Sequence, residues 1–191
     1  MSKKYELVVD DTITLWGWKL FRIKALIRFG SVDAGDLGGY VCTEDNLSQE
    51  GDAWVSGNAK VWGDAKVWGN AKVWGDAKVW GNAEVSGDAK VWGDAKVWGD
   101  AKVWGNAKVW GNAKVWGNAK VSDFEDVIVF KNHWSSGRHF TYTKSNKMWR
   151  VGCFYGTGQE LIDKAYRDSE KSGNFYKAYV EFIASLEGLG E

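Results

Sequence analysis

The chain has 191 residues, with 25 basic and 25 acidic side chains and no proline. A formal net charge of zero gives no global reason to expect a nucleic-acid or membrane partner. Cys42 and Cys153 match no metal-ligand spacing, so a reduced cytoplasmic protein is expected. No apolar segment follows the basic first residues, and no apolar run approaches the ~20 residues of a membrane span.

Residues 1–50 are expected to form a cap and a degenerate first coil. Leu7–Val9 and Ile13–Leu15 have the apolar character of strands, and Leu20–Arg28 fits either a strand or a short helix. Such a cap is expected because the end of a solenoid exposes strand edges. Counting back in sixes from the repeats places these residues at inward positions: Val41 and Leu47 in phase with Ala53, and Leu37, Thr43 and Gln49 in phase with Val55. The degenerate coil is therefore predicted to begin near Leu37.

Residues 51–122 are twelve hexapeptides with the consensus Gly-Asp/Asn-Ala-Lys-Val-Trp and no break in register. Alanine and valine alternate with lysine and tryptophan, which is the period of a short strand with one apolar face. The Gly-Asp or Gly-Asn pair suits a sharp corner, because these residues tolerate a positive φ. The pattern predicts a prism of short strands around a narrow Ala/Val interior, and the strict spacing argues against disorder.

Residues 123–191 are predicted to form a compact βββαα module. Its strands are expected at Val127–Phe130, Phe140–Thr143 and Met148–Phe154. Thr157 and Glu160 have the spacing of a capping box, so a helix should follow to about Lys171 and stop at Gly173. The apolar spacing from Asn174 to about Glu187 predicts a second helix.

The repeat resembles the hexapeptide of left-handed parallel β-helices, in which three hexapeptides make one coil of 18 residues. Both flanks resemble a group of phage and prophage hexapeptide-repeat proteins, through Leu20–Leu26, Gly35–Val41, Asn46–Gly51 and Gly152–Thr157. The resemblance implies a mainly β chain with a left-handed β-helix of about 4–5 coils, an N-terminal cap and a small C-terminal module. It also implies a phage-like origin and the host cell cytoplasm as location. The chain departs from that group in having tryptophan at most of the outward positions where tyrosine or serine is usual.

Residues 18 apart should stack, so the outside of the prism divides into three sides. Side A carries Trp54, Ser56, Lys72, Trp74, Lys90, Trp92, Lys108 and Trp110. Side B carries an unbroken tryptophan column, Trp62, Trp80, Trp98 and Trp116, beside a lysine column, Lys60, Lys78, Lys96 and Lys114. Side C alternates Trp68, Ser86, Trp104 and Ser122 beside Lys66, Glu84, Lys102 and Lys120.

The corners show a further order. Two of them alternate Asp and Asn along the stack, which keeps like charges about 10 Å apart. The corner of side B instead reads Asn58, Asp76, Asp94, Asn112 and places two aspartates together.

The tryptophan columns have two readings. They stabilise the stacking of coils as aromatic ladders, or they form an exposed apolar patch that meets a partner. We expect a non-enzymatic binding or scaffold protein that forms a dimer or trimer and sequesters or inhibits a host component, either through the Trp/Lys face of side B or through the C-terminal module. An anionic small ligand or single-stranded nucleic acid is a weaker alternative. The predicted binding residues are the two columns of side B together with Arg138 and His139, whose Ser/Gly loop offers backbone N–H groups to an anion.

An enzyme is the other alternative. Acyltransferases with this fold use a histidine that projects from the coils, and the twelve repeats contain none. A transferase would have to work at an intersubunit groove or through His133, His139 and Cys153 in the C-terminal module. The sequence therefore predicts no catalytic residue, no metal site and no cofactor.

Overall fold

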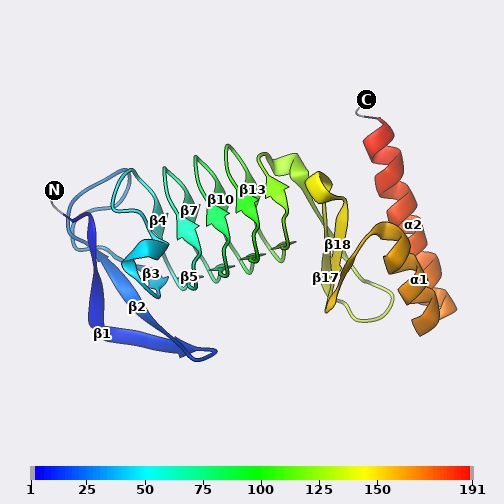
Figure 1. Cartoon of the computed structure of the whole chain (residues 1–191), viewed down its shortest axis with the longest axis horizontal. Helices are drawn as coiled ribbons and strands as arrows, with labels where there is room; N and C mark the ends of the chain where they lie inside the picture. Colours follow the sequence, from blue (N-terminus) through cyan, green and yellow to red (C-terminus); the bar gives the residue numbers. More distant parts are fainter. Residues whose placement is uncertain (1–2, 190–191) are drawn as a thin grey trace.

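The computed structural model describes residues 3–189 as a β-solenoid with a β-hairpin at one end and a small α+β module at the other (Figure 1). Side A is the parallel sheet of β4 (Trp54–Val55), β7 (Lys72–Val73), β10 (Lys90–Val91) and β13 (Lys108–Val109). Side B contains β5 (Lys60–Val61), β8 (Lys78–Val79), β11 (Lys96–Val97) and β14 (Lys114–Val115). Side C contains β6 (Lys66–Val67), β9 (Glu84–Val85), β12 (Lys102–Val103) and β15 (Lys120–Val121). The predicted three-sided prism with an 18-residue repeat is confirmed.

Backbone hydrogen bonds join each coil to the next with this 18-residue register. The Lys60 N–H donates to the Ala77 carbonyl (3.0 Å), and the Trp62 N–H donates to the Val79 carbonyl (3.1 Å). Every repeat alanine and valine is buried, and together they form one core that runs along the axis. The left hand of the coil, which the resemblance implies, stays a prediction.

The corners need glycine for two reasons. Gly69 has a φ of +71°, which disfavours side chains, and a Cβ added to it would lie 3.0 Å from the Gly87 nitrogen of the next coil.

The alternation of Asn and Asp in the corners forms hydrogen bonds between coils. The Asn70 side-chain amide donates to Asp88 (3.1 Å), and the Asn82 amide donates to Asp100 (2.9 Å).

The N-terminal hairpin consists of β1 (Tyr5–Leu15) and β2 (Trp18–Ala25) and continues into β3 (Leu37–Val41). Two separate strands were expected over residues 7–15, and the structure has one long strand whose register shifts between Val8 and Thr12. The segment that fitted either a strand or a helix is the strand β2. These three strands extend the sheet of side B to seven strands, and Tyr5 and Ile23 join the core of the first coil, so this region covers the N-terminal end of the prism as expected.

The degenerate coil is present, but its predicted phase is wrong. Val41 pairs with Val61, and Leu47 forms a bridge with Val67, so the spacing is 20 residues instead of 18. The count in sixes missed two extra residues in the corner after Leu47. Leu47 and Val41 are buried as expected, whereas Leu37 and Thr43 are exposed. A short 3-10 helix η1 (Glu44–Asn46) precedes this corner, and the buried Asn46 amide donates to the Gly63 and Ala65 carbonyls.

Lys4 holds the enlarged corner closed. Its ammonium group is buried and donates to the carbonyls of Glu50, Gly51 and Ala53 at 3.4, 3.2 and 3.0 Å. Burial lowers the pKa of Lys4 to about 8. A lysine side chain thus replaces the coil-to-coil hydrogen bonds that a regular corner makes with its neighbour.

The C-terminal module has four strands, not three. They are β16 (Val127–Lys131), β17 (His139–Thr143), β18 (Met148–Val151) and β19 (Phe154–Gly156). The 3-10 helix η2 (Phe124–Asp126) connects β15 to β16, the 3-10 helix η3 (Lys144–Asn146) connects β17 to β18, and both contact β15 of the solenoid. The stretch predicted as one strand over residues 148–154 folds back on itself at Gly152, which has a φ of +57°. The module docks on the last coils, where the Lys114 N–H donates to the Thr141 hydroxyl (3.0 Å).

Two helices, α1 (Gly158–Asp168) and α2 (Glu170–Gly188), cover this sheet. The Thr157–Glu160 capping box is present as predicted. Gly173 does not stop a helix; it lies buried inside α2, and the first helix ends earlier, where Ser169 caps the second. Among residues 3–189, no helix is long and apolar enough to cross a membrane.

The first prediction concerns Lys4. Lys4→Met leaves three carbonyl acceptors without their donor, at a cost of about 1–3 kcal/mol, which lowers the melting temperature by several degrees. Burial lowers the pKa of Lys4 from its ordinary value of 10.5 to about 8, so the folded state loses this proton at a lower pH than the unfolded state does. The unfolded state therefore binds more protons in this window, and the advantage of the wild type over the variant should grow as the pH rises from 8 to 10. Lys3→Met, which removes an exposed ion pair with Glu44, is the control, and an equal loss in both variants would contradict this role.

The second prediction concerns Gly173. An alanine inside a helix normally stabilises it by about 1 kcal/mol relative to glycine. A Cβ at Gly173 would lie 2.2 Å from the ring of Tyr166, so Gly173→Ala should instead lower the melting temperature. Gly188→Ala in the same helix meets no atom within 4 Å and should leave the melting temperature unchanged or raised. Thermal unfolding followed by circular dichroism measures both.

Candidate functional site

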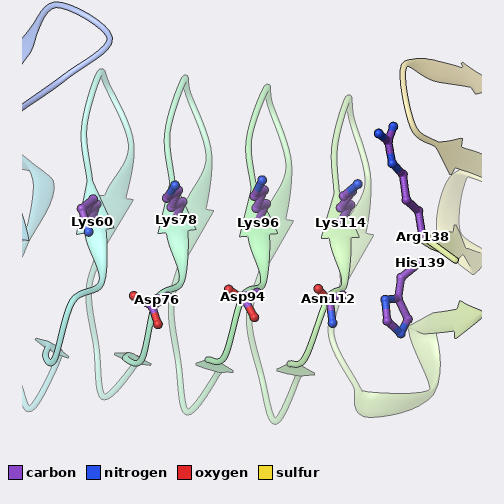
Figure 2. Close-up of a pocket in the computed structure, with 9 residues that line it drawn as sticks. All are labelled: Lys60, Asp76, Lys78, Asp94, Lys96, Asn112, Lys114, Arg138 and His139. Atoms are coloured by element: carbon purple, nitrogen blue, oxygen red, sulfur yellow. The ribbon is translucent and has the colours of Figure 1, made fainter. Parts of the chain in front are cut away.

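An elongated groove of about 540 Å³ runs along side B. We call it the lysine groove. It is lined by the lysine column, Lys60, Lys78, Lys96 and Lys114, by the corner residues Asp76, Asp94 and Asn112, and by Arg138 and His139. Figure 2 shows the lysines in a row over successive coils, with the corner residues on one side of the row and Arg138 and His139 at the C-terminal end. The structure thus brings together six of the ten residues that the sequence predicts for the site.

The groove is cationic. Five cationic side chains face two carboxylates, and within residues 3–189 none of these groups forms an ion pair. Burial lowers the pKa of Lys60 and of Lys114, and the adjacent charges of Lys78 and Lys96, respectively, lower it further. Neighbouring lysines therefore repel one another, and a bound anion would relieve that repulsion.

The acidic rim of the groove is the corner that departs from strict alternation. In the other two corners an asparagine amide bridges to the aspartate of the next coil. In the corner of side B, Asp76 and Asp94 are adjacent, and within residues 3–189 neither carboxylate accepts such an amide bond. The break in the pattern was visible in the sequence, although these residues were not predicted as part of the site.

The tryptophan column of side B forms the expected ladder. Successive indoles from Trp62 to Trp116 are stacked with ring centroids 5.1, 4.8 and 5.6 Å apart. The column is not an open patch. At the N-terminal end, Trp16 packs edge-on against Trp62 and Trp80, and Trp62 is only 2% exposed.

The opposite end of this ladder is covered by the C-terminal sheet. The Tyr155 ring lies 4.4 Å from Trp116, and the Arg150 guanidinium lies 4.5 Å from the same indole. The four indoles therefore bind the two terminal regions of the chain to the solenoid, and the open part of side B is the lysine groove.

The loop before Arg138 is organised by a buried asparagine. The Asn132 side-chain oxygen accepts from the N–H groups of Ser135 and Ser136, and its amide donates to the Tyr176 hydroxyl. These backbone N–H groups are not free for the anion that was expected to bind there. The contribution of this loop to the groove is the Arg138 side chain, next to His139.

A second cavity of about 360 Å³ adjoins the lysine groove and shares Asn112 and His139 with it. It lies between the last coils and the C-terminal sheet, and Trp110 and Val129 contribute apolar surface to it. This cavity could not be predicted from the sequence, because it is formed only where β16 and β17 meet side A and side B.

The residues of the enzymatic alternative are not gathered into one cluster. His133 packs edge-on against Trp134 and Phe175, whereas His139 lies at the groove. Cys153 is exposed in the turn between β18 and β19. Within residues 3–189, no group of three or more His, Cys, Asp or Glu side chains is placed to hold a metal ion.

Fold and groove together define the chain as a β-solenoid protein with a small C-terminal α+β module. Neither the known family models nor the curated proteins give a match to the chain. Inferences about its function therefore start from the groove itself.

Proposed function

We propose that this is a binding protein whose lysine groove takes an extended anionic ligand, and that single-stranded nucleic acid fits it best. The observation that carries the proposal is a lysine row that forms no ion pair within the described residues and that meets, through His139, a cavity lined by Trp110. Side chains that combine positive charge with an aromatic surface suit a chain of phosphates that carries flat bases.

The row of lysines spans three coil steps, about 14 Å, which is long for one phosphate and suits an oligonucleotide. The phosphates would follow the lysine row, away from Asp76 and Asp94, which would repel them. These carboxylates can accept hydrogen bonds from sugar hydroxyls or base amino groups. At the C-terminal end, Trp110 is 48% exposed and offers a face for stacking of one base.

The resemblance of both flanks to phage proteins supports a host-directed role, in which the ligand is a component of the infected cell. A protein with an acidic surface is the second candidate for the ligand, because the same lysine row would attract it. The covered tryptophan ladder favours the nucleic acid, since the large apolar surface expected for a protein partner on side B is already used within the chain.

The third prediction tests the groove with a fluorescently labelled oligothymidylate. Lys78→Ala/Lys96→Ala should raise the Kd at least tenfold and reduce the salt dependence of binding by about 1.4 in log–log slope, because two phosphate contacts are lost. The matched control is Lys72→Ala/Lys90→Ala, which removes lysines from the same positions of the repeat on side A. Fluorescence anisotropy at several salt concentrations measures both.

Two further measurements separate the alternatives. An abasic oligonucleotide should bind more weakly than oligothymidylate, and Trp110→Ala should remove that difference, since it reports base stacking. Polyglutamate that competes better than the oligonucleotide would identify an acidic protein as the ligand. Equal effects of the side A and side B variants would overturn the assignment of the groove.

A further inference from the structure

Side C differs from the other two sides in that its tryptophans do not stack on one another. Trp68 and Trp104 are 47% and 37% exposed, and among the described residues no other aromatic ring stacks on either. Sides A and B each carry consecutive stacked indoles. On side C, Ser86 and Ser122 stand where the ladder would require Trp.

The serine leaves a slot in the column. Trp68, Ser86 and Trp104 line a cavity of about 380 Å³ together with Gly87 and Gly105. In the intact ladders of sides A and B, each coil holds one indole, with neighbouring ring centroids 4.8–5.6 Å apart. Trp68 and Trp104 are two coils apart, so the slot at Ser86 has the thickness of one indole.

The column is complementary to itself. If a second copy faces side C with its long axis reversed, the order Trp–Ser–Trp–Ser is read backwards as Ser–Trp–Ser–Trp. Trp104 of the second copy then enters the slot at Ser86, and Trp68 of the second copy lies over Ser122. The four indoles would interdigitate into one ladder, which reproduces between two chains the four-indole ladder that side B forms within one chain.

The neighbouring charged column is complementary to itself at its two central positions. Its order is Lys66, Glu84, Lys102, Lys120, and Glu84 already pairs with Lys102 of its own chain at 3.3 Å. The register that places tryptophan over serine also places Glu84 of each copy opposite Lys102 of the other copy. Two new ion pairs therefore form at the centre of the interface. Lys66 meets Lys120 only at the ends, where water and salt screen the repulsion.

We propose that side C is the interface of an antiparallel homodimer with a two-fold axis between the coils of Ser86 and Trp104. Such an interface is isologous, and each chain contributes the same two indoles and the same charge pair. A parallel arrangement does not fit, because it would place the tryptophan column of one copy against the lysine column of the other. The dimer leaves the lysine groove on side B free, so it does not depend on the proposed function.

The decisive variant is Ser86→Trp, which completes the ladder within one chain and closes the slot to the second copy. Sides A and B show that consecutive coils accept tryptophan at this position, so the fold should persist. In light scattering after size exclusion, the wild type should have twice the chain mass of 21.4 kDa, and the variant should have the mass of one chain. The control is Ser56→Trp, the same substitution in the equivalent column of side A, which should remain a dimer.

A charge exchange tests the register. Glu84→Lys should raise the dimer dissociation constant at least tenfold, and Glu84→Lys/Lys102→Glu should restore it, because the exchanged pairs are again complementary across the two-fold axis. Sedimentation equilibrium measures these constants. A wild type that is monomeric at 100 µM, or a dimer that survives Ser86→Trp, would overturn the proposal, while oligonucleotide binding by Ser86→Trp should stay unchanged.

Discussion

The structure depends on one constraint, the hydrogen-bonded register of 18 residues between successive coils. This register places equivalent residues of every third hexapeptide above one another, inside and outside the prism. Inside, it stacks small alanines and valines into a continuous core. Outside, the register stacks the residues at each outward position of the repeat into a column. One substitution therefore changes a single point of a regular surface, and the same substitution in every coil changes a whole face.

The columns explain why the three sides differ in role although their strands are nearly identical. On side B, β3 pairs with β5 and joins the N-terminal hairpin to the solenoid, and the C-terminal sheet docks on β14. These additions cover its indole ladder from Trp16 to Tyr155 and leave its lysine row open. On side C, Leu47 pairs with Val67 and the Lys120 N–H donates to the Ser145 hydroxyl, but within the described residues no aromatic ring packs on Trp68 or Trp104, and both remain exposed.

The outward tryptophans therefore fall into two groups, those that stack on one another and those that do not. Where tryptophan is present in every coil, stacking satisfies the apolar surface within the chain and ties the ends of the solenoid to its middle. Where serine alternates with tryptophan, as on side C, neither Trp68 nor Trp104 stacks on another indole of its own column. The charged columns also differ between the sides at a few positions. Asp76 and Asp94 are adjacent in the corner column of side B, where the other corners alternate Asp and Asn, and Glu84 replaces a lysine on side C.

The sequence by itself determined the solenoid, its repeat length, its inward residues and the membership of each column, because a strict six-residue pattern leaves one way to alternate apolar and polar side chains. It also predicted the lysines, Arg138 and His139 that the groove unites. The tertiary structure alone decided that two extra residues follow Leu47, that Gly173 packs on Tyr166 within a helix, and that the indoles of side B are covered. These outcomes depend on contacts between segments far apart in the chain, such as Lys4 with the first corner and Thr141 with Lys114. The local periodicity of the sequence does not predict such contacts.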